Sequence, residues 1–238
     1  MTSKENMGVR MLFYLGGLII MTLGVAFSVK SDLGVSPISS IPYTITCVTG
    51  MDLGAATIVF SIFMVILQII ILRKQFKMIN LLQLPIGILF GLFLSFCCGL
   101  MVYLPEPSGM IMKFVLMLIS TFIVALGVFV YVAAGFVPLA PEGAMLAICK
   151  MTKFKFPNVK LCSDITMVVV SGITCLVVIK ELGSVGIGTI IAAVLVGNEV
   201  KLMTKFFGKR IDKLLGVNFD ADCEKKDDNL HAIKKTNQ

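Results

Sequence analysis

Long apolar stretches alternate with short polar ones along most of this 238-residue chain. Six of the stretches hold about twenty mostly apolar residues, the length that a helix needs to cross a hydrocarbon layer of ~30 Å. The predicted spans are 11–29, 54–72, 81–104, 113–134, 161–179 and a last span that begins with 185–200. This pattern predicts an all-α, polytopic membrane protein with six long transmembrane helices.

Two further apolar elements, 37–49 and 141–151, are too short to cross a bilayer as helices. Each follows a long span and is led by a stretch that carries Pro, Gly and an acid. Irregular backbone at membrane depth occurs only where protein buries it or water lines it. We therefore predict two short, broken helices that are re-entrant and meet near the middle of the membrane. The first also has many hydroxyl groups, which we expect to line a wet path because a dry core would leave them unsatisfied.

The positions of the Lys and Arg residues distinguish this topology from one with eight full crossings. The chain is 57% hydrophobic and 15% charged, so its net charge of +7 indicates membrane topology rather than nucleic-acid binding. With two re-entrant elements, both termini and the basic clusters at 73–77 and 150–160 share one side of the membrane. Eight crossings would place Arg73, Lys74 and Lys77 outside. The positive-inside rule therefore favours six spans, with the N- and C-termini in the cytoplasm.

The two halves of the chain resemble one unit used twice. Residues 23–27 match 126–130 at three identical positions that include a glycine, and Pro37 then matches Pro141. Three crossings per unit would turn the second copy upside down, so we predict an inverted internal repeat with a substrate site at the midplane.

This repeat defines the predicted domains. They are a cytoplasmic N-terminus at 1–10, membrane repeat 1 at 11–104, membrane repeat 2 at 113–204, a basic amphipathic helix at 205–216 and a disordered cytoplasmic tail at 217–238. The basic helix is expected on the anionic inner leaflet of the bilayer. It could equally be a continuation of the last span.

Polar groups at membrane depth are costly, so each one is a candidate for function. The candidates gather around the two short elements. The predicted substrate-binding residues are Asp32, Ser36, Pro37, Ser39, Pro141, Glu142 and Asp164. The positive ends of two half-helix dipoles would favour an anionic group on the solute, whereas the acids favour a cation or a proton, so the sign of the solute stays open.

The three acids also have structural explanations. Glu142 could cap a half-helix, Asp32 could be solvated at the membrane surface, and Asp164 could pair with Lys160 one turn earlier. The weaker candidates are Gln68, Asn80, Gln83 and Glu199, the last of which could pair with nearby lysines.

No catalytic constellation is present in the sequence. The single histidine, His231, lies in the polar tail, and no glycine-rich nucleotide-binding motif precedes a helix. The seven cysteines form no C-x-x-C pair and fall mostly in apolar segments. We therefore expect no enzyme activity, no cofactor and no metal site.

These observations favour a transporter or channel for a small polar solute, with its site between the two broken helices. The alternative is a membrane scaffold that binds a partner protein through the basic cytoplasmic face formed by 150–160 and 201–213. Small residues such as Gly16, Gly24, Gly87 and Gly91 permit a homodimer, although packing within one chain uses the same residues.

The stretches 24–37 and 127–143 resemble the YczE/YitT family of bacterial multi-pass membrane proteins. The features that carry the resemblance are Asp32-Leu-Gly34 with Pro37, their echo Pro141-Glu-Gly143, and the Gly186-x-Gly-Thr189 that opens the last span. The resemblance covers roughly 10–204. It implies a bacterial inner membrane location and an internal duplication, and little about activity.

Overall fold

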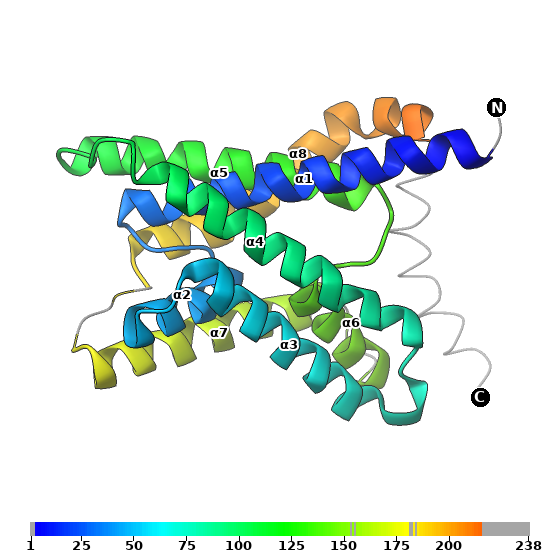
Figure 1. Cartoon of the computed structure of the whole chain (residues 1–238), viewed down its shortest axis with the longest axis horizontal. Coiled ribbons are helices and arrows are strands. Elements are labelled where there is room, and N and C mark those ends of the chain that lie inside the picture. The colour runs from blue at the N-terminus through cyan, green and yellow to red at the C-terminus, as the bar shows by residue number, and fades with distance from the viewer. Residues whose placement is uncertain (1–2, 153, 155, 181–182, 184, 216–238) are drawn as a thin grey trace.

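The protein is all-helical in its computed structural model, which describes residues 3–215 except 153, 155, 181–182 and 184 (Figure 1). The α-helices are α1 (Ser3–Ser31), α2 (Pro37–Thr49), α3 (Leu53–Leu72), α4 (Gln83–Met101), α5 (Met110–Ala133), α6 (Ala140–Thr152), α7 (Phe156–Val178) and α8 (Ile187–Leu215). Two 3-10 turns, Arg73–Gln75 and Met78–Leu82, join α3 to α4.

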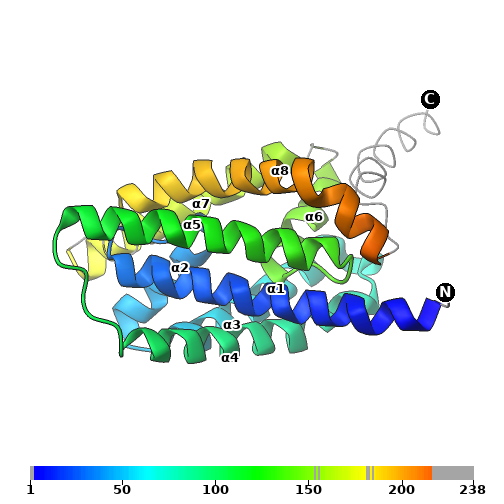
Figure 2. The ribbon, with the colours of Figure 1, turned by 90° about the horizontal axis from the view of Figure 1, so that it is seen from above.

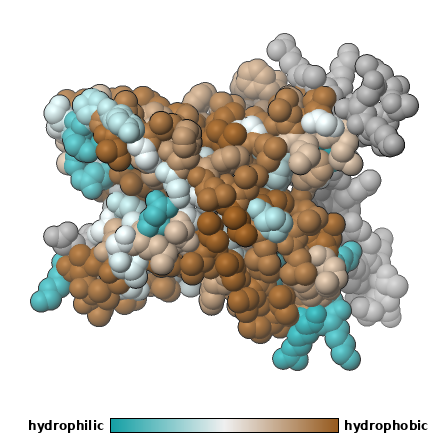
Figure 3. All heavy atoms as spheres, viewed as in Figure 1, coloured by the Kyte–Doolittle hydropathy of each residue, from teal (hydrophilic) through white to brown (hydrophobic). Residues whose placement is uncertain are grey.

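Six of these helices are long and apolar enough to cross a membrane, which confirms the six predicted spans. The spans are Met7–Ser31, Leu53–Gln75, Met78–Met101, Met110–Ala133, Asn158–Val178 and Ile187–Gly208. Large apolar side chains such as Phe96, Ile111 and Phe122 remain exposed on the outside of the bundle. Apolar residues cover much of the middle of the face in Figure 3, while polar residues lie mostly toward its two ends. This surface suits a hydrocarbon solvent.

The two short helices, α2 and α6, are 13 residues each and do not cross. In Figure 1 the chain leaves α1 at the left-hand end, returns toward the middle, and α2 then runs back to the left. The chain leaves α5 at the right-hand end and α6 mirrors this path. The beginnings of the two helices share one hydrophobic cluster, because Ile38 and Ile41 pack against the cluster to which Ala140 and Ala144 belong.

Helices α1 and α5 cross closely at glycines. A Cβ on Gly24 would lie 2.6 Å from the backbone nitrogen of Val124, and one on Gly127 would lie 2.4 Å from that of Met21. Figure 2 shows α5 between α1 and α8, with α4 on the other side of α1. Gly24, which we considered for a dimer interface, is therefore used within the chain.

The packing follows a reciprocal pattern. Helix α3 packs on α6 while α7 packs on α2, and α4 packs on α1 while α8 packs on α5. Two related halves would produce such a pattern, and the internal repeat itself stays a prediction.

Helix α8 runs unbroken to Leu215, so the basic segment continues the last span, which is one of the two alternatives that the sequence left open. Pro42 lies inside α2, which runs from Pro37 to Thr49 without a break. The predicted disordered tail at 217–238 lies outside the described residues, as do Lys153 and Lys155 of the basic loop.

Candidate functional site

The loop that leads into α2 is held by backbone and small groups. The backbone N–H of Gly188 donates to the carbonyl oxygen of Leu33 at 2.8 Å, and the Ser28 hydroxyl donates to that of Gly34 at 3.2 Å. The approach of α8 is so close that a Cβ on Gly186 would lie 2.2 Å from the Leu33 oxygen. Protein groups rather than water therefore satisfy this stretch of irregular backbone.

The hydroxyls of α2 also find partners inside the protein. Ser40 donates to the carbonyl oxygen of Pro37 at 2.6 Å, Thr44 to that of Ser40 at 2.9 Å, and Thr46 to that of Pro42 at 3.2 Å. Such bonds to carbonyls one turn earlier are common for Ser and Thr in helices. The expected wet path along the whole helix is therefore not needed to explain this composition.

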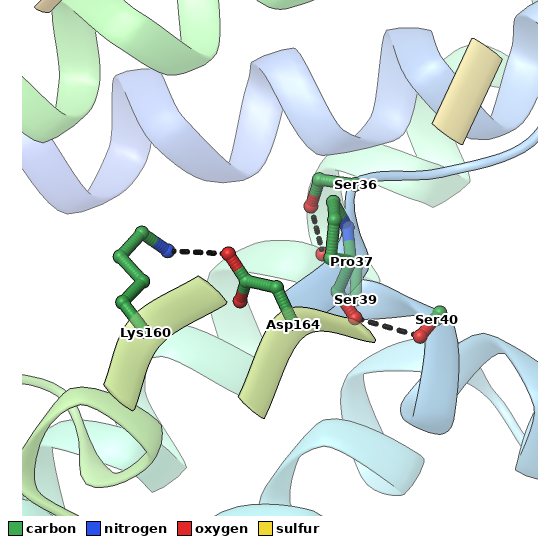
Figure 4. Close-up of polar contacts among 6 residues, drawn as sticks. All are labelled: Ser36, Pro37, Ser39, Ser40, Lys160 and Asp164. Carbon is green, nitrogen blue, oxygen red and sulfur yellow. Dashed lines mark hydrogen bonds and ion pairs between the residues drawn. The ribbon is translucent and has the colours of Figure 1, made fainter. Parts of the chain in front are cut away.

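At the beginning of α2, by contrast, the Ser36 hydroxyl does not bond to a backbone group of the helix. The Ser36 side chain caps no backbone N–H of the helix and donates to the Ser39 hydroxyl at 3.0 Å (Figure 4). Ser36 also lines a cavity of about 10 Å³, which has room for one water molecule. The cavity is lined by Val25, Ser28, Ser36, Ser120, Thr121, Val124, Ala192 and Val196.

Asp164 lies on α7, which packs against α2, and Figure 4 shows it beside the beginning of α2. Its Oδ2 accepts a hydrogen bond from Lys160 at 3.0 Å, the pairing that the sequence offered as a structural explanation. Its Oδ1 is buried without a hydrogen-bond partner in the described part of the chain, and the side chain is only 18% exposed. The ion pair therefore satisfies only half of this carboxylate.

The loop that leads into α6 is held by long side chains of α1. Arg10 Nε donates to the carbonyl oxygen of Ala134 at 3.0 Å, and the Tyr14 hydroxyl donates to that of Val137 at 2.8 Å. The Arg10 guanidinium also lies over the ring of Phe136. These contacts hold the backbone of the loop between α5 and α6 against α1.

Glu142, at the beginning of α6, accepts a hydrogen bond from the hydroxyl of Tyr131. Tyr131 is buried, and its ring packs edge-on against that of Tyr14 at 6.0 Å between centroids. Arg10 and Tyr14 thus bond to the loop before α6, and Tyr131 bonds to Glu142 in its first turn. The sequence analysis did not single out these three residues, since a tyrosine inside an apolar span is indistinguishable from an ordinary core residue.

Two buried glutamines support the first turn of α6. Gln68 is 1% exposed and Gln83 is 2% exposed. The Gln68 amide donates to Gln83 Oε1 at 2.7 Å and to the carbonyl oxygen of Ala140 at 3.1 Å. A Cβ on Gly143 would collide with both side chains. These weaker sequence candidates therefore have a structural role at the half-helix.

Asp32 lies apart from the other predicted residues. It is at the exposed end of α1, where its carboxylate pairs with Lys113 at 2.7 Å. Nearby, Lys30 pairs with Glu106 at 2.5 Å, and the four charged side chains line an open depression of about 530 Å³. This position corresponds to the surface explanation that the sequence allowed for Asp32.

An apolar groove of about 700 Å³ runs beside both half-helices. Ile41 of α2, Pro141 and Ala144 of α6, Leu67 of α3 and Met167 of α7 line part of it. Its volume falls in the range of ligand pockets, but its walls offer few polar groups.

The structure thus divides the predicted site into three parts. Ser36, Pro37, Ser39 and Asp164 gather at the beginning of α2, Pro141 and Glu142 lie at the beginning of α6, and Asp32 lies at the end of the bundle. Together with the spans, these features define a multi-pass helical membrane protein with two short helices whose first turns share one hydrophobic cluster inside the bundle.

Comparison with known proteins agrees with this class. A model described as "Family of unknown function (DUF6198)" matches residues 8–205, and the chain therefore belongs to this family. The chain is also 27% identical over 196 residues to the "Uncharacterized membrane protein YczE" of Bacillus subtilis (strain 168), an alignment that covers 82% of this chain and 85% of the relative. The resemblance drawn from the sequence is thus confirmed. No solved structure matches the chain.

Proposed function

We propose that the protein transports a small polar solute across the membrane and binds it at the beginning of α2, between α7 and α8. The observation that carries the proposal is Asp164, whose Oδ1 is buried and has no hydrogen-bond partner among the described residues. Asp164 lies on α7, which packs against α2, and Figure 4 draws it near the beginning of α2, where the hydroxyls of Ser36 and Ser39 lie. A half-satisfied acid inside a span is expensive, and a bound solute would supply its missing partner.

The half-helix architecture supports this assignment. Transporters place broken helices and their unbonded first-turn N–H groups around a midplane site. Here Ser36 leaves the first turn of α2 uncapped by its side chain, and Asp164 lies on the neighbouring helix α7. The site therefore combines donors with one acid, and a solute that has both an acceptor and a donor group fits it best.

The distribution of charge supports a topology with both termini in the cytoplasm of a bacterial cell. The ends of α3 and α6, which carry Arg73, Lys74 and Lys150, lie at the same end of the molecule as the beginning of α1 (Figure 1). At the opposite end Lys30 and Lys113 are each paired with an acid. The beginning of α1 and the end of α8 share the more basic end, which agrees with the positive-inside rule.

The test uses proteoliposomes that contain the full-length protein and a panel of radiolabelled amino acids, small amines, hydroxy acids and sugars. We expect at least one member to enter faster than in protein-free liposomes, and Asp164→Asn to remove the difference. Glu106→Gln, at an exposed ion pair, is the matched control and should transport normally. Uptake equal to that of empty liposomes across the panel would favour the alternative, a scaffold that binds a partner through its basic face.

A further inference from the structure

The last span carries an acid, Glu199, that the proposed solute site does not use. It lies near the middle of Ile187–Gly208, and its contact on α5, Thr121, lies at the middle of Met110–Ala133. An ionisable side chain at this depth is expensive to keep, so it requires an explanation. The sequence left open that Glu199 pairs with nearby lysines, whereas the structure places it against Thr121.

The hydrogen-bond geometry favours a protonated carboxyl. Thr121 has one hydroxyl proton, and its oxygen lies 2.9 Å from the carbonyl oxygen of Leu118 but 3.5 Å from Glu199 Oε1. The shorter contact takes the threonine proton, which leaves two lone-pair oxygens facing each other across the longer one. A proton on Glu199 turns that contact into a hydrogen bond from the carboxyl to Thr121 Oγ1.

The second carboxyl oxygen leads to the same conclusion. Glu199 Oε2 is buried and has no hydrogen-bond partner within the described residues. An ionised carboxylate accepts bonds at both oxygens, and burying it unpaired is far more costly than burying a neutral carboxyl.

The charged and titratable groups on the neighbouring helices have other partners. On α5, Lys113 pairs with Asp32 and Tyr131 donates to Glu142. On α1, the groups Arg10, Tyr14 and Lys30 bond to Ala134, Val137 and Glu106, respectively. On α2, Tyr43 and Cys47 hydrogen-bond each other. On α8 itself, Lys201 and Lys205 are exposed. None of these described side chains supplies a counter-charge to Glu199.

A metal cation fits the position less well than a proton does. Hard cations take six or more oxygen ligands, and the contacts of Glu199 offer one carboxyl and one hydroxyl. A proton needs only the acceptor that Thr121 provides.

Glu199 also has a short connection to the beginning of α2. It shares a helical face with Val196 and Ala192, three and seven residues earlier. Both line the small cavity that Thr121 and Ser36 also line. We propose that Glu199 is a proton-binding site at mid-depth, which holds its proton on Thr121 Oγ1 and exchanges it through this hydroxyl-lined cavity. Its role as the coupling group rests on the proposed transport function, whereas proton binding does not.

The experiment is pH-titrated infrared difference spectroscopy on the full-length protein in lipid nanodiscs. The wild type should show a carbonyl band of a protonated carboxyl that loses intensity as the pH rises and shifts in heavy water. Glu199→Gln should lose this band, together with about one titrating proton. Thr121→Val keeps the carboxyl but removes its acceptor, so the band should move to higher frequency. Glu106→Gln, which changes an exposed acid, should leave the band in place.

The outcomes separate this inference from the transport proposal. A titration that is identical in wild type and Glu199→Gln overturns the proton site, whatever the uptake assay shows. A change that depends on Glu199 but follows sodium concentration rather than pH overturns it too, in favour of a cation. If the band is lost in Glu199→Gln while the solute panel gives no uptake, the proton site stands and the transport proposal fails. Should Glu199→Gln fail to fold, the band shift in Thr121→Val decides the question.

Discussion

The two loops that lead into the half-helices solve one problem by different means. Both must satisfy irregular backbone inside the bundle. The loop before α2 relies on the backbone of Gly188 and the short side chain of Ser28, in contacts too tight for any Cβ at Gly186. The loop before α6 relies on two long side chains, Arg10 and Tyr14. The first loop is therefore fixed by close packing, whereas the second is tied by bonds that a rotamer change can release.

The largest effect is expected where the first loop meets α8. In Gly188→Val the added Cβ would start 2.7 Å from the Leu33 oxygen, so the loop must move and its hydrogen bond is lost. We expect a loss of about 3 kcal/mol in the free energy of unfolding, read as a lower melting temperature in detergent.

The control for this variant is Gly197→Val in the same helix, where a Cβ meets nothing within 4 Å. It should be close to wild type. If the two variants melt together, the loop before α2 is not held by close packing, and the contrast between the loops disappears.

An intermediate effect is expected at the second loop. Tyr14→Phe keeps the ring packing but leaves the partly buried carbonyl of Val137 without its donor. The expected loss is about 2 kcal/mol, measured in the same melting assay. Tyr103→Phe is the matched control because that side chain is 87% exposed and should tolerate the change. Equal melting temperatures for the two variants would show that the second loop does not depend on this bond.

The smallest effect is expected at Asp32, at the entrance to the first loop. Its ion pair with Lys113 is largely exposed, so Asp32→Asn should lower the free energy of unfolding by less than about 1 kcal/mol. The residue has a positive φ of 54°, which Asn tolerates better than Ala does. Asp32→Ala should therefore melt below Asp32→Asn. The reverse order would show that the backbone conformation at position 32 does not set the difference between the two neutral variants.

The sequence predicted the elements better than the contacts between them. Span length and hydropathy are local properties, so the six crossings and the two short helices could be read directly. The Lys160–Asp164 pair lies one turn apart and was within reach for the same reason. By contrast, Arg10 and Ala134 meet across more than a hundred residues. No local sequence pattern predicts a contact between residues so far apart in the chain.

The partners of the polar residues were likewise hard to predict from the sequence. Hydroxyl-rich α2 suggested a wet path, but the carbonyls of the helix itself accept most of its hydroxyls. Glu199 was noted as a weaker candidate because lysines follow it in sequence, and only the packing of α5 on α8 shows that it faces Thr121. Depth in the membrane, rather than neighbours in sequence, decides which acids need a partner.

The central claim is that the two half-helices begin inside the membrane, after loops that enter from opposite ends of the bundle (Figure 1). The most direct measurement is labelling of single cysteines at positions 36 and 142, in a background with the seven native cysteines replaced, by a membrane-impermeant thiol reagent added to either side. We predict that position 36 reacts from the face opposite the termini and position 142 from the face of the termini. Labelling of both from one face, or of neither from any face, would contradict the account.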